Sequence, residues 1–381
     1  MKQRLFVTLS LAGLAMATFG ATKTKATIKS LNKTTIQQPT YTEWHDLQVN
    51  AINRFPLHTN FFTYPADDWV SEKDGKIVSK DILHMNKTES KYFLSLDGTW
   101  KFNWVANADQ RPTDFYKEDL DDSKWKTMNL PGIWEMNGFG DPEYVNVGFG
   151  WRGHFDQQPP AVPTKDNHVG SYRRIIDIPA NWDGKQVVAH FGSVTSNIYL
   201  YVNGKFAGYA EDSKVAAEFD ITPYLKKGKN LIAFQTFRWC DGSWDEDQDF
   251  WRLSGVARES YLFARDAKLH LEDVRVTPDL VNNYKDGVLN ISTKVKGNGK
   301  LVFTLFDKDG KQVATTTGVA KNGTANFSLQ VANPQKWSAE TPYLYTLQVS
   351  LMGAQKKDAM KAASMTPVKV GFRKVEIKNK Q

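Results

Sequence analysis

The sequence predicts an all-β protein built from two successive β-sandwiches. From about Tyr92 onward, apolar side chains recur at every second position in short runs, which is typical of strands with one buried face. Turn signals separate these runs, and the clearest are Asn203-Gly204 and Asp309-Gly310. The sequence contains no heptads, helical repeats or alternating strand–helix units, so coiled-coil, solenoid and α/β folds are not expected.

The first sandwich is predicted at residues 92–265. Asn203-Gly204 supplies both positive-φ positions of a type I′ turn, so the runs on either side of it should form a hairpin. One short helical turn is expected at residues 222–227, stopped by Gly228. A loop-rich segment at 105–170 makes this domain the larger of the two and fits a jelly-roll-type β-sandwich. The predicted strands are 171–178, 186–191, 196–202, 205–209, 230–238 and 259–263.

The second sandwich is predicted at residues 267–373. About seven short strands occur there within roughly 100 residues, with a turn every ten or so residues. That spacing is typical of an immunoglobulin-like β-sandwich. The predicted strands are 269–278, 287–295, 300–306, 312–316, 325–331, 344–351 and 368–372.

Residues 1–21 have the features of a secretory signal peptide. Two basic residues open the chain, an apolar stretch runs from Leu5 to Phe19, and Ala15-Met16-Ala17 or Ala21 offers a cleavage site. Residues 22–91 are expected to form a flexible leader and an extended N-terminal segment. We therefore expect export, to the periplasm or to the extracellular space.

Charge and composition exclude several classes of protein. The formal net charge is +7, but residues 1–40 and 351–381 each carry six excess positive charges, so residues 41–350 are net negative by five. No nucleic-acid partner is therefore expected. No apolar run beyond residue 20 reaches the roughly 18 residues of a spanning helix, so membrane insertion is not expected. Cys240 is the only cysteine, which excludes a disulfide scaffold, and it should be a small core residue.

The motifs of nucleotide-binding enzymes, zinc proteases and serine hydrolases are absent. No P-loop, H-E-x-x-H or G-x-S-x-G occurs. Tryptophan, asparagine and acidic residues instead concentrate in the segments 131–152 and 238–252. Aromatic rings with Asp, Asn and Arg are suited to binding sugars, which present apolar CH faces and fixed hydroxyls. The alternative is that these tryptophans belong to the core and the carboxylates satisfy buried arginines and loop N–H groups.

A set of ordered motifs carries a family resemblance. In the first predicted domain they are Asp97-Gly-Thr-Trp-Lys-Phe102, Leu130-Pro-Gly-Ile-Trp134, Gly170-Ser-Tyr-Arg-Arg174, Val202-Asn-Gly204, Gly208-Tyr-Ala-Glu-Asp-Ser213, Glu218-Phe-Asp220 and Trp251-Arg-Leu-Ser-Gly-Val256. The motif Asn53-Arg-Phe-Pro-Leu-His58 precedes them in the N-terminal segment. In the second they are Trp337-Ser-Ala-Glu-Thr-Pro-Tyr-Leu-Tyr345 and Val370-Gly-Phe-Arg373. Over about residues 41–376, the chain resembles the sugar-binding and immunoglobulin-like domains of glycoside hydrolase family 2. Asp241-Gly-Ser243 and Glu246-Asp-Gln-Asp-Phe-Trp251 are similar to the large bacterial β-galactosidases specifically.

The resemblance implies three substrate-binding residues. Asp212, in the Gly-Tyr-x-x-Asp-Ser motif, would contact the galactose 6-hydroxyl and a sodium ion. Asn146 would contact the sugar ring, with Val147 beside it. From the residues alone, Asp212 could equally be a turn-capping aspartate at a hairpin exit. Sodium and magnesium are implied for the complete enzyme, which is expected to be a homo-oligomer, while this chain alone is expected to hold no cofactor.

The resemblance also implies that the catalytic glutamates lie elsewhere. In this family they belong to a (β/α)₈ barrel of about 250 residues that follows the second domain. Residues 374–381 are expected to be a stub leading toward such a barrel, and no catalytic residue is expected in this chain.

Two functions remain open. In the first, the chain is the N-terminal, non-catalytic portion of a retaining β-galactosidase. It binds β-galactosides together with a separate or downstream barrel. In the second, it is a freestanding exported carbohydrate-binding or scaffold protein. A jelly-roll glycanase with its own carboxylate pair is disfavoured, because the acids lie in loops rather than on strands.

Overall fold

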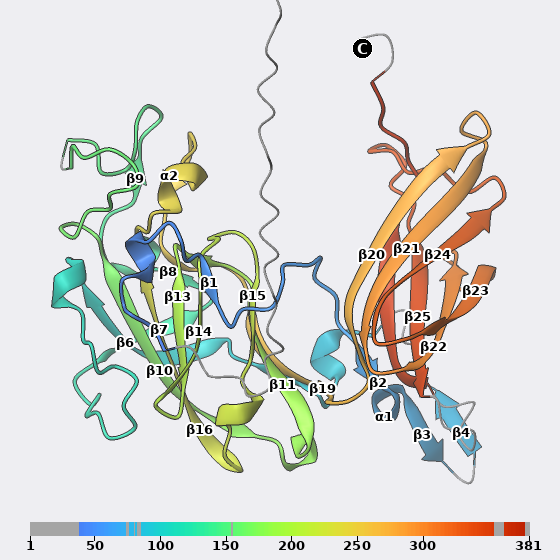
Figure 1. The fold of residues 1–381 in the computed structure, drawn as a ribbon, viewed down its shortest axis with the longest axis horizontal. Helices are drawn as coiled ribbons and strands as arrows, with labels where there is room; N and C mark the ends of the chain where they lie inside the picture. The colour runs from blue at the N-terminus through green and yellow to red at the C-terminus, as the bar shows by residue number, and fades with distance from the viewer. Residues whose placement is uncertain are drawn as a thin grey trace, which may run out of the picture. The chain divides into compact units, whose positions relative to one another are not determined.

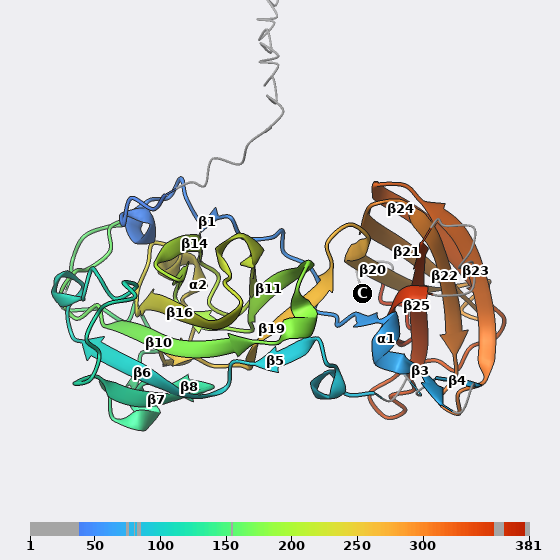
Figure 2. The same cartoon turned by 90° about the horizontal axis from the view of Figure 1, so that it is seen from below.

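The computed structural model describes residues 38–73, 76–79, 81, 85–153, 155–353 and 362–377. The predicted signal peptide and the first part of the predicted leader lie outside these residues, as does the end of the predicted stub at 378–381. The described residues form two sets of antiparallel strands (Figures 1 and 2). Among them, no helix has the length and apolar character needed to span a membrane.

The first sandwich packs a seven-stranded sheet against a four-stranded sheet. The large sheet has the order β1-β14-β13-β16-β10-β6-β7 and the small one the order β15-β11-β19-β5. The strands of the large sheet are Ala51–Ile52 (β1), Gly98–Val105 (β6), Lys126–Leu130 (β7), Val169–Ile178 (β10), Ile198–Val202 (β13), Lys205–Ala210 (β14) and Gly228–Phe237 (β16). Those of the small sheet are Phe93–Ser95 (β5), Lys185–Phe191 (β11), Ala217–Asp220 (β15) and Ser260–Asp266 (β19). This architecture confirms the predicted sandwich.

The predicted hairpin turn lies between β13 and β14. Asn203 and Gly204 have φ values of 49° and 74°, as a type I′ turn requires. The side chain of Asn203 also holds the turn in place, because its Nδ2 donates to the Tyr224 carbonyl at 2.8 Å and its Oδ1 accepts from the Leu231 N–H at 2.9 Å. The predicted helical turn is a 3-10 helix, η6 (Thr222–Tyr224), and Gly228 with φ 77° begins β16.

The large sheet is covered on both faces. One face, with Trp100, Tyr172 and Phe234, packs against the small sheet. The other face, with Tyr199, Tyr201 and Tyr209, packs in a second cluster with Trp44 and Ile52 of the N-terminal segment. All five residues of β13 are consequently buried, so its two faces do not alternate between core and solvent. The predicted alternation fails there because a distant part of the chain covers the outer face.

The second sandwich packs a five-stranded sheet against a three-stranded sheet. Their orders are β2-β26-β25-β22-β23 and β20-β21-β24, so seven of the eight strands come from the predicted region and β2 comes from the N-terminal segment. The strands of the larger sheet are Tyr64–Pro65 (β2), Gly299–Phe306 (β22), Gln312–Ala320 (β23), Tyr345–Gly353 (β25) and Ala362–Val370 (β26), and those of the smaller are His270–Val281 (β20), Asp286–Lys296 (β21) and Gly323–Val331 (β24). In β21, buried positions alternate with less buried ones, as predicted for a half-buried strand. The core of the second sandwich includes four fully buried side chains, Leu289, Leu301, Phe303 and Leu347.

Shorter elements connect these sheets. The strands among them are Val70–Lys73 (β3), Lys76–Ser79 (β4), Gly132–Ile133 (β8), Glu143–Tyr144 (β9), Val194–Thr195 (β12), Trp251–Arg252 (β17) and Gly255–Val256 (β18). The helices are Glu43–His45 (η1), Ala66–Trp69 (α1), Lys87–Glu89 (η2), Ala108–Gln110 (η3), Glu135–Asn137 (η4), Ala180–Trp182 (η5) and Ser243–Glu246 (α2).

Candidate functional site

The segments that carry the predicted sugar contacts meet at one end of the first sandwich. Figure 1 shows β9 and α2 at that end, and β9 pairs antiparallel with β17. Asn146 and Val147 follow β9, and Asp212 follows β14. The chain between β16 and β17, which includes α2, contacts both of these loops.

Asp212 sits in a tight turn directly after β14. Its φ of 80° is left-handed, a conformation that aspartate tolerates better than most residues. The Glu211 N–H donates to the Asn50 carbonyl at 3.0 Å, which ties the start of the turn to the N-terminal segment. The Asp212 side chain is 39% exposed, and its Oδ2 accepts from Arg54 Nη1 at 2.6 Å. The turn thus presents a carboxylate at the surface with one oxygen held by an arginine.

Asn146 and Val147 are both exposed, and the Val147 side chain is 65% accessible. Two arginines hold the backbone around them. Arg252 Nη2 donates to the Val145 carbonyl at 3.1 Å, and Arg152 Nη1 donates to the Val147 carbonyl at 2.8 Å. The side chains of Asn146 and Val147 therefore remain available to a ligand while their backbone is anchored.

The segment after β16 connects the two loops. Glu246 of α2 accepts from the Ser213 N–H at 2.8 Å, next to Asp212. Trp244, also in α2, packs against Phe149 with 4.1 Å between ring centroids. Among the described residues, no hydrogen bond or ion pair joins Asp212 directly to Asn146 or Val147, so their relative placement depends on this segment.

The structure divides the aromatic residues of these loops into two groups. Trp134, Trp151 and Trp239 are at least nine-tenths buried and belong to the packed interior. For these three residues, the alternative that the tryptophans are core residues is correct. Tyr144 and Trp251 are 54% and 55% exposed, and their rings lie 5.5 Å apart across the β9–β17 pair. Tyr144 and Trp251 thus present ring surface that a sugar could contact.

The hollow beside the Asp212 turn is small. A hollow lined by Ser213, Arg238 and Arg252 measures about 40 Å³. Pockets for small molecules usually measure about 300–1,000 Å³. This hollow is therefore too small to enclose a sugar.

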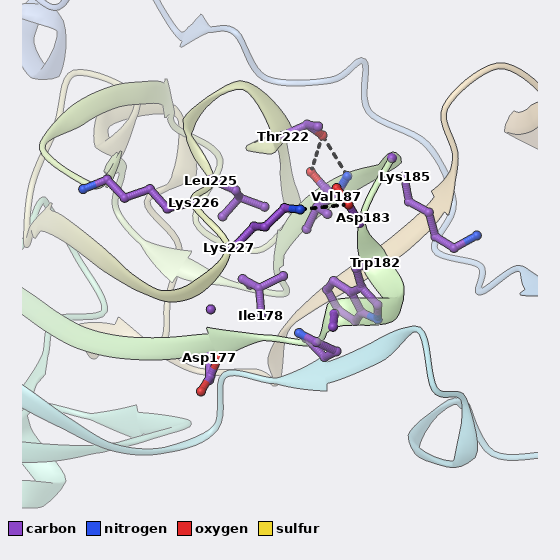
Figure 3. A pocket seen from close by; sticks show the side chains of 14 residues that line it. Asp177, Ile178, Trp182, Asp183, Lys185, Val187, Thr222, Leu225, Lys226 and Lys227 are labelled. Atoms are coloured by element: carbon purple, nitrogen blue, oxygen red, sulfur yellow. Dashed lines mark hydrogen bonds and ion pairs between the residues drawn. The ribbon is translucent and has the colours of Figure 1, made fainter.

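A larger hollow lies elsewhere in the first sandwich. It measures about 560 Å³ and is lined where β10 ends and where β11 and β16 begin (Figure 3). Trp182 and Ile178 form apolar walls, and Lys227 pairs with Asp183 at 3.4 Å. None of the predicted site residues lines this hollow, so it lies apart from the motifs that carry the predicted sugar contacts.

The residues around Asp212 do not form a sodium site by themselves. A hard cation needs several oxygen ligands. One oxygen of Asp212 already accepts from Arg54, a positive charge that disfavours a second cation there. Asp212 by itself offers one carboxylate oxygen free of Arg54, so sodium at this position would need further oxygen ligands.

Arg54 is the site residue that sequence reasoning missed. It belongs to the motif Asn53–His58, which was recognised, but its partner Asp212 is 158 residues away along the chain. No spacing rule links positions so far apart. The motif indicates that this segment belongs to the family pattern, but only the tertiary structure identifies the contact between Arg54 and Asp212.

Comparisons with known proteins follow the two sandwiches. Residues 93–266 match the domain family described as "Glycosyl hydrolases family 2, sugar binding domain". Residues 269–373 match the family described as "Glycosyl hydrolases family 2". The chain belongs to glycoside hydrolase family 2. The resemblance found in the sequence motifs is thereby confirmed.

The similar curated proteins are β-galactosidases. The chain is 36% identical over 352 residues to the β-galactosidase of Priestia megaterium, covering 89% of this chain and 32% of that protein. It is 32% identical over 347 residues to the β-galactosidase large subunit of Leuconostoc lactis, covering 88% of this chain and 52% of that subunit. The chain thus spans about a third to a half of the relatives' length and corresponds to their N-terminal part.

Solved structures share the fold. A β-glucuronidase of Bifidobacterium dentium, in complex with coumarin-3-O-glucuronide, matches with a TM-score of 0.61 and 17% identity, covering 78% of this chain and 51% of that one. A family 2 member from Bacteroides cellulosilyticus matches with a TM-score of 0.56 and 22% identity, covering 75% of this chain and 37% of that one. At these identities the likeness concerns the fold alone.

Proposed function

We propose that this chain supplies the sugar-binding front of a β-galactosidase whose catalytic carboxylates lie on another segment. The observation that carries this proposal is the match of nearly nine-tenths of the chain to the N-terminal part of β-galactosidases. The geometry supports it, because Asp212 is held exposed beside a hollow too small to enclose a sugar. The reaction is the hydrolysis of terminal β-D-galactosides with retention, which needs two carboxyl groups about 5–5.5 Å apart.

In this proposal Asp212, Asn146 and Val147 contact the galactoside. Asp212 accepts a hydrogen bond from a sugar hydroxyl, for which its Oδ1 is available beside the Arg54-bound Oδ2. Asn146 offers an amide to the ring hydroxyls, and Val147 offers an apolar contact. Asp212 also provides one ligand to sodium when oxygens from the missing segment complete the site, and the complete enzyme is a homo-oligomer that also uses magnesium.

The missing segment is a (β/α)₈ barrel, carried on the same polypeptide or on a partner chain. One relative is named as a large subunit, which supports a partner chain as well as a single polypeptide. We further propose that residues 1–21 direct export to the periplasm or the extracellular space. N-terminal sequencing of the mature protein tests this, and an intact Met1 would contradict it.

A chimera tests the function directly. Residues 41–373 of this chain replace the matching segment of the Priestia megaterium relative, and hydrolysis of a chromogenic β-galactoside is measured. We expect activity from the chimera and none from this chain alone. A chimera that is folded by circular dichroism and yet inactive would contradict the proposal, as would turnover by the chain alone.

Within the active chimera, Asp212→Asn tests the site. Losing a charged hydrogen bond to substrate should lower kcat/KM about ten- to hundredfold. Asp245→Asn is the matched control, because Asp245 is an exposed acid in the neighbouring helix α2 and should leave kcat/KM unchanged. If both substitutions lowered kcat/KM equally, Asp212 would not be a substrate-binding residue.

The freestanding binding protein is tested by calorimetry on the chain alone. A few exposed hydrogen bonds worth about 0.5–1.5 kcal/mol each do not outweigh the cost of association, so galactose should bind weakly. Submicromolar binding by the lone chain would favour the freestanding protein over the proposed one.

A further inference from the structure

Three buried side chains with metal-ligating atoms meet beneath the Asp212 turn. Glu211 directly follows β14, and Cys240 and Asp241 lie just after β16. One carboxylate oxygen from each acid and the Cys240 Sγ all lie within 4.8 Å of one another. The three residues are 8%, 1% and 5% exposed, respectively.

The cluster has excess negative charge for a buried position. Among the described residues, no lysine, arginine or histidine pairs with Glu211 or Asp241. Glu211 accepts one hydrogen bond, from the Tyr209 hydroxyl at 2.6 Å. The Oδ1 atom of Asp241 is buried and has no hydrogen-bond partner within the described part of the chain. An unpaired buried carboxylate is costly, and nearly all such groups in native proteins find a partner.

Either a proton or a metal cation could neutralise this cluster. Burial, with a further contribution from the charge of Asp241, raises the pKa of Glu211 to about 8, so a proton shared between the two acids is one solution. In that solution Cys240 is a core residue, packed with Trp44 and Phe237, whose thiol contacts Glu211. A cation binds all three groups at once.

The ligand types indicate which cation fits. A thiolate is a soft ligand that calcium, magnesium and sodium do not favour, whereas zinc accepts sulfur and carboxylate oxygen together. Ligand atoms around a tetrahedral zinc are roughly 3.5 Å apart, given zinc–sulfur and zinc–oxygen bonds of about 2.3 and 2.0 Å. The three atoms must therefore approach one another by up to about 1 Å.

We propose that Glu211, Cys240 and Asp241 form a structural binding site for a divalent cation of the zinc class. The fourth position is filled by water or by the Tyr209 hydroxyl. The ion links the end of β14 to the segment after β16, and so fixes the turn that presents Asp212. This site does not depend on the proposed galactosidase function, because it needs only residues of this chain.

Gly242 gives a structural reason for the cluster's close packing. A Cβ at this position would lie 2.8 Å from the Glu211 Oε2 atom and 3.6 Å from the Cys240 Sγ. Any larger residue would therefore displace the carboxylate from the cluster. Gly242→Ala is expected to weaken metal binding without removing a ligand.

Cadmium titration of the full 381-residue chain tests the site. Cadmium replaces zinc at such sites, and its bond to a thiolate produces an ultraviolet charge-transfer band. We expect the band to saturate at one cadmium per chain at about pH 8, where proton competition is reduced, and to disappear when zinc is added. Because Cys240 is the only cysteine, the band can come from no other residue.

Substitutions make the outcome decisive. Cys240→Ser should abolish the band. Glu211→Gln, which keeps the shape of the side chain and removes its charge, should raise the zinc Kd at least tenfold. Asp245→Asn, an exposed acid nearby, is the matched control and should change neither. Two outcomes would overturn the proposal. One is the absence of a cadmium band from folded protein, which would leave only a proton at the cluster. The other is an equal zinc-induced rise in Tm for the parent chain and for Cys240→Ser.

Discussion

Arg54 determines how Asp212 is presented to solvent. The ion pair joins a mostly buried guanidinium, 11% exposed, to a carboxylate that is 39% exposed. Solvent screens a pair of this kind, so Arg54→Ala should cost only about 0.5–1 kcal/mol in urea unfolding. Lys227→Ala is the control, since Lys227 and Asp183 are 91% and 74% exposed and their pair should contribute nothing measurable. Equal losses for the two variants would show that Arg54 has no special role.

Glu218 is a buried acid held between two histidines. Its Oε1 lies 2.8 Å from His190 Nδ1 and its Oε2 lies 3.0 Å from His58 Nε2. Burial would raise the pKa of Glu218, but the hydrogen bonds from His190 and His58 outweigh it and lower the pKa to about 2. The same contact raises the pKa of His58 above 6.5, against the opposing effect of burial. Glu218 and His58 therefore make a proton-dependent contribution to stability.

The sign of that contribution follows from the direction of each shift. Glu218 stabilises the fold above its ordinary pKa of 4.5, and the stabilisation is lost as the pH falls toward 2. His58 stabilises the fold below pH 6.5, and that part is lost as the pH rises through its raised pKa. In Glu218→Gln both losses should disappear, which urea unfolding across this pH range measures. An unchanged pH dependence in the variant would contradict the assignment.

At the scale of elements, the β13–β14 hairpin depends on Asn203. Its side chain makes buried hydrogen bonds to Tyr224, Asn230 and Leu231, and its backbone is left-handed. Asn203→Ala should therefore cost about 2–4 kcal/mol, combining lost buried hydrogen bonds with backbone strain. Gly310→Ala serves as the control. It has a φ of 78° and open space at its Cβ, so it should cost only about 1 kcal/mol from backbone strain. Equal costs would mean that the side-chain bonds of Asn203 contribute little.

Elements differ in how well local sequence predicts them. The β13–β14 turn and the strand β21 follow their local pattern, because turn chemistry and alternation are properties of neighbouring residues. The two-residue strands β1 and β2 could not be predicted. Each exists only because a sheet edge from a distant part of the chain is available to pair with it.

At the scale of the whole molecule, the described chain ends with exposed apolar residues. Val375 and Ile377, after the last core residue Phe372, are 81% and 84% exposed. We expect the chain to self-associate as its concentration rises, because these side chains gain by leaving water. The double variant Val375→Lys, Ile377→Lys should shift sedimentation toward the monomer. Ile175→Lys, at a 59% exposed position in β10, is the control and should not. If both variants shifted sedimentation equally, Val375 and Ile377 would have no specific role in self-association.

The sequence by itself determined the all-β class, the positions of many strands along the chain and the family, because alternation, turns and motifs are properties of contiguous residues. It also nominated Asp212, Asn146 and Val147, whose contact with sugar stays a prediction. Only the tertiary structure decided that Arg54 holds Asp212 and that Glu211 meets Cys240 and Asp241. These partners come from different strands and loops. Chain folding brings such groups together through sheet register and core packing, and no local spacing records that outcome.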